Sequence, residues 1–126
     1  ILIVLCYDVF DYLFGHLSLF SRSKNTIYIF DRYIYDYFTE KNWSNTPRWL
    51  IKTIMRLIPV PALIVVLQND PEVIHKRKAE LSVADIQYTQ ERIEALLSGS
   101  PNLMRISTLN SPEEIAKAVA YRAGLL

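Results

Sequence analysis

The sequence predicts an α/β fold in which short parallel strands alternate with helices. Segments with helical and strand-like patterns follow one another as helix, strand, helices, strand, helices, strand and helix, which is typical of a layered α/β domain. The run Leu63 to Leu67 is wholly apolar, as in a parallel strand that is covered on both faces. The chain shows no internal repeat, low-complexity segment or linker, so we expect a single domain over residues 1–126.

The first half of the chain is expected to contain one buried strand between helices. Residues 1–21 are apolar nearly all round, which suits a helix packed on a sheet. The β-branched and aromatic run 26–30 ends at Asp31 and predicts a buried strand. We expect a helix to begin within 33–40. Pro47 favours the start of another helix, because proline fits the first turn.

The second half is expected to alternate two strands with three helices. The strands are expected at 62–68 and 103–107, and the helices from Asp70 to about Glu80, from roughly 83 to 98, and from Ser111 to near Gly124. Ser82 is the expected cap of the middle helix, and Gly99 its expected end. Ser111, followed by Pro112 and then Glu114, predicts a capping box at the last helix.

Composition narrows the classes of function. Hydrophobic residues make up 51% of the chain and charged residues 21%, which is an ordinary globular balance. A formal net charge of +1 gives no general field for nucleic acid, so we expect no nucleic-acid partner. The single cysteine, Cys6, excludes an internal disulfide and favours a reducing, cytoplasmic compartment.

The first residues form an apolar stretch, as expected if the sequence begins within a helix or strand. The chain opens without Met, and no basic segment precedes the apolar run, so it does not resemble a signal peptide. Asp8, Asp11 and His16 interrupt the stretch, and charges inside a membrane span are costly. We therefore expect a buried helix and no membrane partner, with a membrane anchor over 1–20 as the remaining alternative.

Two oppositely charged residues follow the first predicted strand. Asp31 and Arg32 come directly after the apolar run 27–30. Open α/β sheets bind ligands at the carboxyl edge of their strands. At that edge Asp31 offers a carboxylate to a metal or a water, and Arg32 offers a guanidinium to a phosphate. A strand that ends in a salt-bridged Asp is the alternative, and the pair taken alone favours it.

A cluster of cations follows the second predicted strand. The expected helix over 71–81 carries three adjacent basic residues, Lys76, Arg77 and Lys78. Beside the same sheet edge, such a helix can close over a triphosphate. A solvated helix face is the alternative, since most charge runs are solvated.

Together, the two features resemble the thymidylate-kinase-like group of P-loop nucleotide kinases. In that group an apolar strand ends in Asp-Arg-Tyr, and a second strand leads through Pro-Glu-Val into a lid helix with Arg-Lys-x-Glu-Leu. The matching residues here are Asp31, Arg32, Tyr33, Pro71, Glu72, Val73, Arg77, Lys78, Glu80 and Leu81.

The chain is most similar to the subgroup often found with polysaccharide genes. That subgroup adds an Asp after Asp-Arg-Tyr, an Asp-Tyr pair with a nearby Gly on the preceding helix, and Pro-Arg-Trp-Leu before the second strand. The matching residues are Asp36, Asp11, Tyr12, Gly15, Pro47, Arg48, Trp49 and Leu50. The resemblance covers nearly the whole chain.

The resemblance implies phosphoryl transfer from ATP to a nucleoside monophosphate or a related phosphorylated acceptor, with Mg²⁺. It implies that Asp31 holds Mg²⁺ through water or orients the acceptor, and that Arg32 clamps the acceptor phosphate. Arg77 would swing in with a lid over about 71–92 and stabilise the transition state. Lys78 and Tyr33 are the implied contacts to the bound nucleotide. The sequence leaves the oligomeric state open, with a homodimer as one option.

The sequence departs from this group in three ways. The P-loop pattern Gly-x4-Gly-Lys-Ser/Thr is absent, because the three glycines are Gly15, Gly99 and Gly124. The segment 41–45 lacks the arginines of the subgroup. Residues 1–20 contain no Arg of the kind with which thymidylate kinases recognise thymine.

These departures lead to two readings of function. The chain is expected to be the C-terminal fragment of an active kinase whose P-loop half lies upstream, and this chain alone is expected to be inactive. The alternative is a degenerate, non-catalytic module for binding or assembly. The implied fold is an incomplete P-loop NTPase fold with three strands, in which the central P-loop strand is missing. We expect a slot where that strand would lie, between 27–31 and 62–68, with Asp31 and Arg77 facing one cleft.

Overall fold

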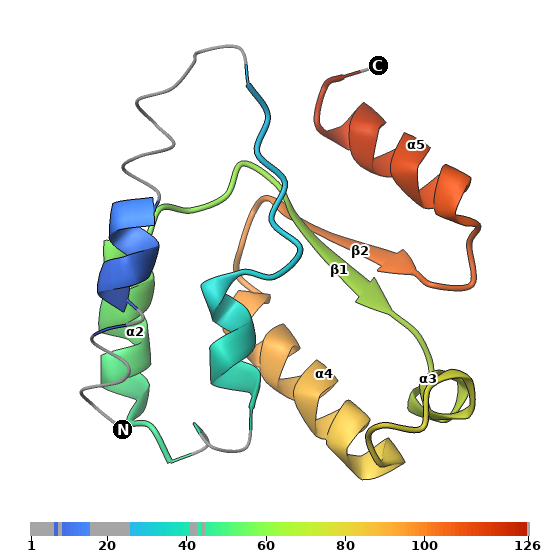
Figure 1. Ribbon diagram of the computed structural model, residues 1–126, viewed down its shortest axis with the longest axis horizontal. Coiled ribbons are helices and arrows are strands. Elements are labelled where there is room, and N and C mark those ends of the chain that lie inside the picture. The colour runs from blue at the N-terminus through green and yellow to red at the C-terminus, as the bar shows by residue number, and fades with distance from the viewer. Residues whose placement is uncertain (1–6, 8, 16–25, 41–42, 44, 126) are drawn as a thin grey trace. The chain divides into compact units, whose positions relative to one another are not determined.

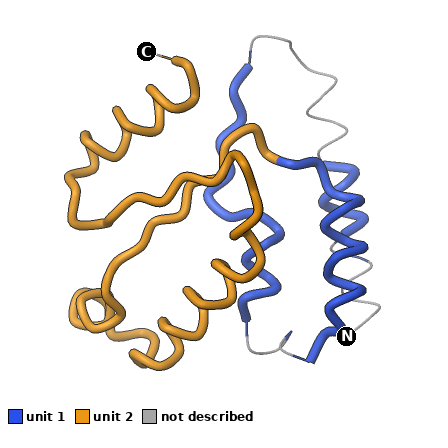
Figure 2. Tube along the Cα trace, turned by 180° about the vertical axis from the view of Figure 1, so that it is seen from behind, with its two compact units in different colours: residues 1–60 blue, residues 61–126 orange. Residues whose placement is uncertain are grey.

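The computed structural model describes residues 7, 9–15, 26–40, 43 and 45–125. The chain divides into two compact units, residues 1–60 and 61–126 (Figure 2). Each unit is described by itself below. Most of the helix predicted over 1–21 lies outside the described residues, but 9–15 are helical as expected.

The first unit is built from short helices around an apolar core. After the helical residues 9–15 come the 3-10 helix η1 (Ile34–Thr39) and the helix α2 (Arg48–Leu57). Helix α2 begins directly after Pro47, as the sequence predicted. The buried apolar side chains of this unit are Ile34, Tyr35, Phe38, Trp43, Ile51, Ile54 and Ile58.

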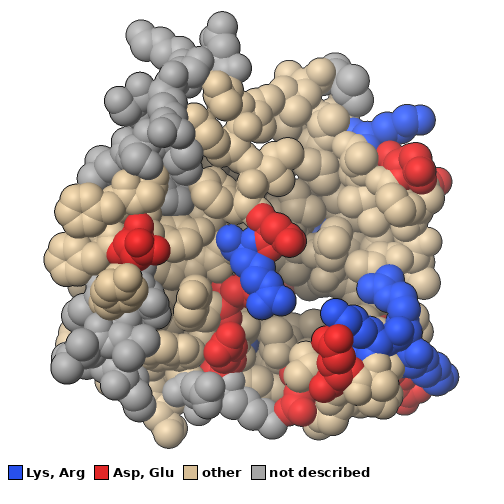
Figure 3. Space-filling view, viewed as in Figure 1, with Lys and Arg blue, Asp and Glu red and all other residues tan. Residues whose placement is uncertain are grey.

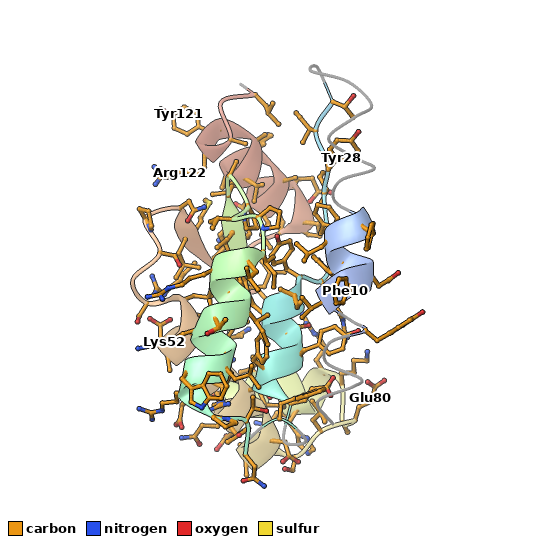
Figure 4. All side chains as sticks on the ribbon, turned by 90° about the vertical axis from the view of Figure 1, so that its left-hand side faces the viewer. Phe10, Tyr28, Lys52, Glu80, Tyr121 and Arg122 are labelled. Atoms are coloured by element: carbon orange, nitrogen blue, oxygen red, sulfur yellow. The ribbon has the colours of Figure 1, made fainter. Side chains whose placement is uncertain are left out.

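The strand predicted over 26–30 is wrong. These residues belong to no strand, and all five are exposed, with Ile29 at 89% (Figure 4, where Tyr28 is labelled). The apolar, β-branched pattern favours an extended backbone, but a strand also needs a neighbour that accepts its hydrogen bonds. No such neighbour pairs with 26–30 within the described chain. The expected slot between two strands therefore has no counterpart, and Asp31 and Arg77 belong to different units.

The second unit contains a parallel pair of strands, β1 (Ile64–Gln68) and β2 (Leu103–Ser107) (Figure 1). Ile64 lies opposite Leu103, and the register continues to Gln68 opposite Ser107. Helices α3 (Pro71–Arg77) and α4 (Val83–Leu97) connect the strands, and α5 (Pro112–Arg122) follows β2. The α/β prediction is thus confirmed for this unit as a small two-stranded parallel sheet, where three strands were expected.

Helix α3 is shorter than predicted. It ends at Arg77, and the extended backbone of Lys78 has φ −148° and ψ 92°. The Nδ1 atom of His75 lies 2.7 Å from the carbonyl oxygen of Leu81, so the end of α3 contacts the segment that begins α4. Residues 78–81 are not helical, and they bring the Leu81 carbonyl back to His75.

The predicted cap residues are confirmed. Asp70 accepts a hydrogen bond from the backbone N–H of Glu72 at 2.8 Å, and Ser82 accepts one from that of Asp85 at 3.2 Å. Ser111 accepts from the N–H of Glu114 at 3.2 Å, while the Glu114 carboxylate accepts from the N–H of Ser111 at 2.8 Å. This reciprocal pair is a capping box.

The capping box gives a stability prediction. Replacing Ser111 by Ala removes the acceptor for the Glu114 N–H, and we expect a loss of about 1 kcal/mol in the free energy of unfolding. Urea unfolding followed by circular dichroism measures this loss. The matched control is Ser98→Ala, since the Ser98 side chain forms no hydrogen bond within the described structure. Equal stability of Ser111→Ala and the unchanged chain would contradict the assigned role of the box.

Candidate functional site

A polar hollow lies at the carboxyl ends of the two parallel strands. It has a volume of about 540 Å³ and is open to solvent. The lining residues come from the ends of β1 and β2, the start of α3 and the middle of α4, and they are Gln68, Asn69, Asp70, Gln90, Arg105, Ile106 and Ser107. This is the edge at which open α/β sheets bind ligands.

Asn69 organises the rim of this hollow. Its Nδ2 donates to Thr108 Oγ1 at 2.9 Å, which joins the segments that follow β1 and β2. Its Oδ1 accepts from the backbone N–H of Asp70 at 2.8 Å, and its carbonyl accepts from Gln90 Nε2 at 2.9 Å. The backbone N–H of Thr108 also donates to the carbonyl of Gln68 at 3.0 Å. Side-chain hydrogen bonds thus connect both strand ends and α4.

The cation in the hollow is paired. Arg105 on β2 donates to Glu94 on α4 through both Nε, at 2.9 Å, and Nη2. The hydrogen bond from Arg105 holds the pKa of Glu94 below its ordinary value, and the same bond raises the pKa of Arg105. A bidentate pair of this kind satisfies the guanidinium geometry. Arg105 therefore fixes α4 to β2, and it must leave Glu94 before it can bind an anion.

The predicted residues Asp31 and Arg32 lie in the first unit. Both are exposed, and they follow the extended residues 26–30. The Nε atom of Arg32 is 3.7 Å from Oδ2 of Asp36, with 83% of the Arg32 side chain exposed. An exposed ion pair at this distance is weak, so the guanidinium can turn toward an external phosphate at little cost.

Tyr33 has a structural role in the same unit. Its ring packs edge-on against Tyr12, Phe30 and Tyr35, with ring centroids 5.2, 5.9 and 4.9 Å away. Its hydroxyl donates to the carbonyl oxygen of Pro59. Burial raises the pKa of the Tyr33 phenol well above its ordinary value, so the hydroxyl keeps its proton and remains a donor. A contact from this hydroxyl to a nucleotide would require it to leave Pro59.

The predicted lid cations lie at the end of α3. Arg77 is the last residue of α3, and Lys78 follows it; both are exposed. The Nζ atom of Lys78 is 3.2 Å from Oε2 of Glu80, in an exposed ion pair. Figure 3 shows Lys and Arg side chains interspersed with carboxylates at the lower right of the molecule. Arg77 and Lys78 thus lie together in the second unit, and Asp31, Arg32 and Tyr33 belong to the first.

The described side chains do not form a cluster of metal ligands. Within the described residues, no group of three or more His, Cys, Asp or Glu side chains could hold an ion. Asp31 offers a single exposed carboxylate. Mg²⁺ commonly keeps several waters and binds through one or two carboxylates together with substrate phosphates. Asp31 thus fits a contact through water, with most ligands supplied by water and nucleotide.

Most of the polar hollow was not expected from the sequence. Asp70 was expected only as a helix start, and no role was expected for Asn69, Gln90 or Arg105. One signal was available, because Gln68, Asn69 and Asp70 interrupt the apolar run where the strand ends. The contributions of Gln90 and Arg105 depend on how α4 packs beside the strands, which no spacing in the sequence specifies.

Comparisons with known proteins add no relative. No protein-family model, no curated protein and no solved structure matches this chain. Among the helices that the structure describes, none is both long enough and apolar enough to cross a bilayer.

Proposed function

We propose that this chain is the acceptor-side and lid portion of an ATP-dependent phosphotransferase of the thymidylate-kinase-like kind. The observation that carries the proposal is the position of α3. This helix starts after only Asn69 and Asp70 at the carboxyl end of β1, and it ends in the exposed cations Arg77 and Lys78. A cationic helix that leaves the ligand-binding edge of a parallel sheet suits a lid over phosphates.

The proposed chemistry consists of positioning and charge neutralisation. Phosphoryl transfer spreads negative charge over the transferring oxygens, and arginines lower the barrier by pairing with that charge. Arg77 takes this role from the lid, and Arg32 holds the acceptor phosphate. Lys78 can pair with a phosphate once it leaves Glu80. Tyr33 follows Arg32 in the chain, and its ring packs against Tyr12, Phe30 and Tyr35.

Mg²⁺ and ATP are the proposed cofactor and co-substrate. Asp31 is the residue that would hold the ion through water, as its single carboxylate allows. Bound Mg²⁺ would neutralise charge on the phosphate oxygens. The proposed acceptor is a nucleoside monophosphate or a related phosphorylated compound, and the proposed setting is a cytoplasmic homodimer without nucleic acid.

Phosphate transfer tests the proposal directly. The 126 residues alone are expected to transfer no label from γ-labelled ATP to any nucleoside monophosphate, because the chain contains no Gly-x4-Gly-Lys-Ser/Thr motif. A protein extended upstream in its own reading frame, through such a motif, is expected to transfer the label. Boiled protein and a version with the P-loop Lys replaced by Ala are the controls.

Two outcomes of that assay would count against the proposal. Turnover by the 126 residues alone would show that transfer needs no P-loop. An upstream frame without the motif, or an extended protein that labels no acceptor, would favour the non-catalytic module instead.

A further inference from the structure

The outer side of α2 carries a row of positive charges. Arg48, Lys52 and Arg56 are spaced four residues apart, so their side chains follow one side of the helix. Lys52 is labelled in Figure 4. All three are exposed, and none forms an ion pair within the described part of the chain. Helix α2 itself contains no Asp or Glu. These cations are therefore available to an external anion.

Apolar side chains are exposed beside this row. Trp49 and Leu57 are 68% and 61% exposed, and Val60, just beyond the helix, is 66% exposed. At 3.6 residues per turn, Trp49 lies next to Arg56, and Leu57 lies further round the helix, past Thr53 and toward the buried Ile54. The Thr53 hydroxyl between them donates to the carbonyl of Trp49 at 2.9 Å. The hydroxyl donor is thus used inside the helix, which lowers the cost of covering this flank.

We propose that this surface, the α2 face (Arg48, Trp49, Lys52, Arg56 and Leu57), binds an anionic lipid bilayer. Helices that lie in the plane of a membrane combine cations on the polar side with Trp and Leu at the boundary of headgroups and acyl chains. On the α2 face the cations meet lipid phosphates, while Trp49 and Leu57 enter the headgroup region, where Trp is enriched. The inner side of α2 stays in the core of its unit.

Single-stranded nucleic acid is the competing partner. It would use the cations and stack a base on Trp49, but it would leave the exposed aliphatic residues Leu57 and Val60 without a role. A peripheral contact with lipid uses all of these residues. Such a contact needs no membrane-spanning helix and does not depend on phosphotransfer. It differs from the expectation, drawn from the sequence, that the chain has no membrane partner.

Vesicle flotation tests the proposal. The 126-residue chain, fused to a soluble carrier protein, is mixed with vesicles of phosphatidylcholine alone or of phosphatidylcholine with phosphatidylglycerol. We expect binding only to the anionic vesicles and a loss of binding at high salt. Each cation near the surface contributes about fivefold in affinity, so Arg48→Gln/Lys52→Gln/Arg56→Gln should weaken binding about a hundredfold.

A matched variant controls for net charge. Lys76→Gln/Lys117→Gln/Arg122→Gln removes the same charge from α3 and α5 and should leave vesicle binding nearly unchanged. Tryptophan emission provides a second readout, because Trp43 is buried and Trp49 is exposed. Anionic vesicles should shift the emission to the blue in the unchanged chain but not in Trp49→Phe.

Several results would overturn the proposal. These are equal loss of binding in both triple variants, equal binding to neutral vesicles, and an emission shift that persists in Trp49→Phe. Binding of single-stranded DNA or RNA that only the α2 variant abolishes, without vesicle binding, would assign the face to nucleic acid. If the α2 triple variant does not fold by circular dichroism, Lys52→Gln alone must weaken vesicle binding about fivefold.

Discussion

In the proposed complete phosphotransferase, replacing Arg77 by Ala is expected to lower kcat by a factor of about a thousand or more. The side chain stands at the exposed end of α3, beyond which the backbone turns at Lys78. An arginine that pairs with the transferring phosphoryl group stabilises charge that is present mainly in the transition state. Its loss should therefore reduce kcat, with a small effect on the KM of the acceptor. Steady-state kinetics with ATP and the preferred acceptor measures both.

The matched control is Arg122→Ala. Arg122 is also an exposed arginine in the last turn of a helix, but on α5. It should leave kcat unchanged. Arg77→Lys should recover only part of the lost rate, since Lys lacks the planar fork that pairs with two phosphate oxygens. Near-normal turnover of Arg77→Ala would remove the lid from the mechanism, and a loss confined to KM would make Arg77 a ground-state contact.

The largest effect on stability is expected from Phe38→Ala. Phe38 is fully buried in η1, at 0% exposure. Truncating a buried Phe removes apolar contacts and leaves a cavity, which costs about 3–5 kcal/mol. A typical domain has a free energy of unfolding of only about 5–15 kcal/mol, so much of the first unit's stability should be lost. Urea unfolding followed by near-ultraviolet circular dichroism reports on the aromatic side chains of this unit.

Tyr37→Ala provides the comparison within the same short helix. Tyr37 is adjacent in sequence but 42% exposed, so its truncation should cost much less than that of Phe38. Similar losses for the two variants would mean that the core of the first unit does not centre on Phe38.

Elements with strong local signals were predictable from the sequence. Strand β2 has the predicted bounds, and α4 begins directly after its predicted cap, Ser82. The capping box at Ser111 involves only side-chain and backbone groups three residues apart, so the sequence specifies it completely. Signals of this kind do not depend on distant parts of the chain.

Features that depend on contacts with distant parts of the chain were not predictable from the sequence. The run 26–30 has the composition of a strand, but nothing in those residues supplies the neighbour that a strand needs. The early end of α3 is accompanied by a contact between His75 and Leu81, which the charge pattern does not indicate. The polar hollow likewise brings Gln90 and Arg105 together from separate elements. For the predicted site, the sequence placed Arg77 on the cationic helix but did not predict that the helix ends there. It also did not anticipate the contact between the Tyr33 hydroxyl and Pro59.

The parallel pair of strands has a consequence for how the second unit folds. Partners in the ladder, such as Ile64 and Leu103, are 39 positions apart, as are Asn69 and Thr108 beyond the strand ends. Closing a loop of this length costs about 3 kcal/mol in chain entropy, whereas a single hydrogen bond contributes only about 0.5–1.5 kcal/mol. No single hydrogen bond between the strands can offset the entropy cost of closing the loop, so these hydrogen bonds must form and break together. Helices α3 and α4, which need only local contacts, can form before the loop closes, and the ladder joins them in one cooperative step.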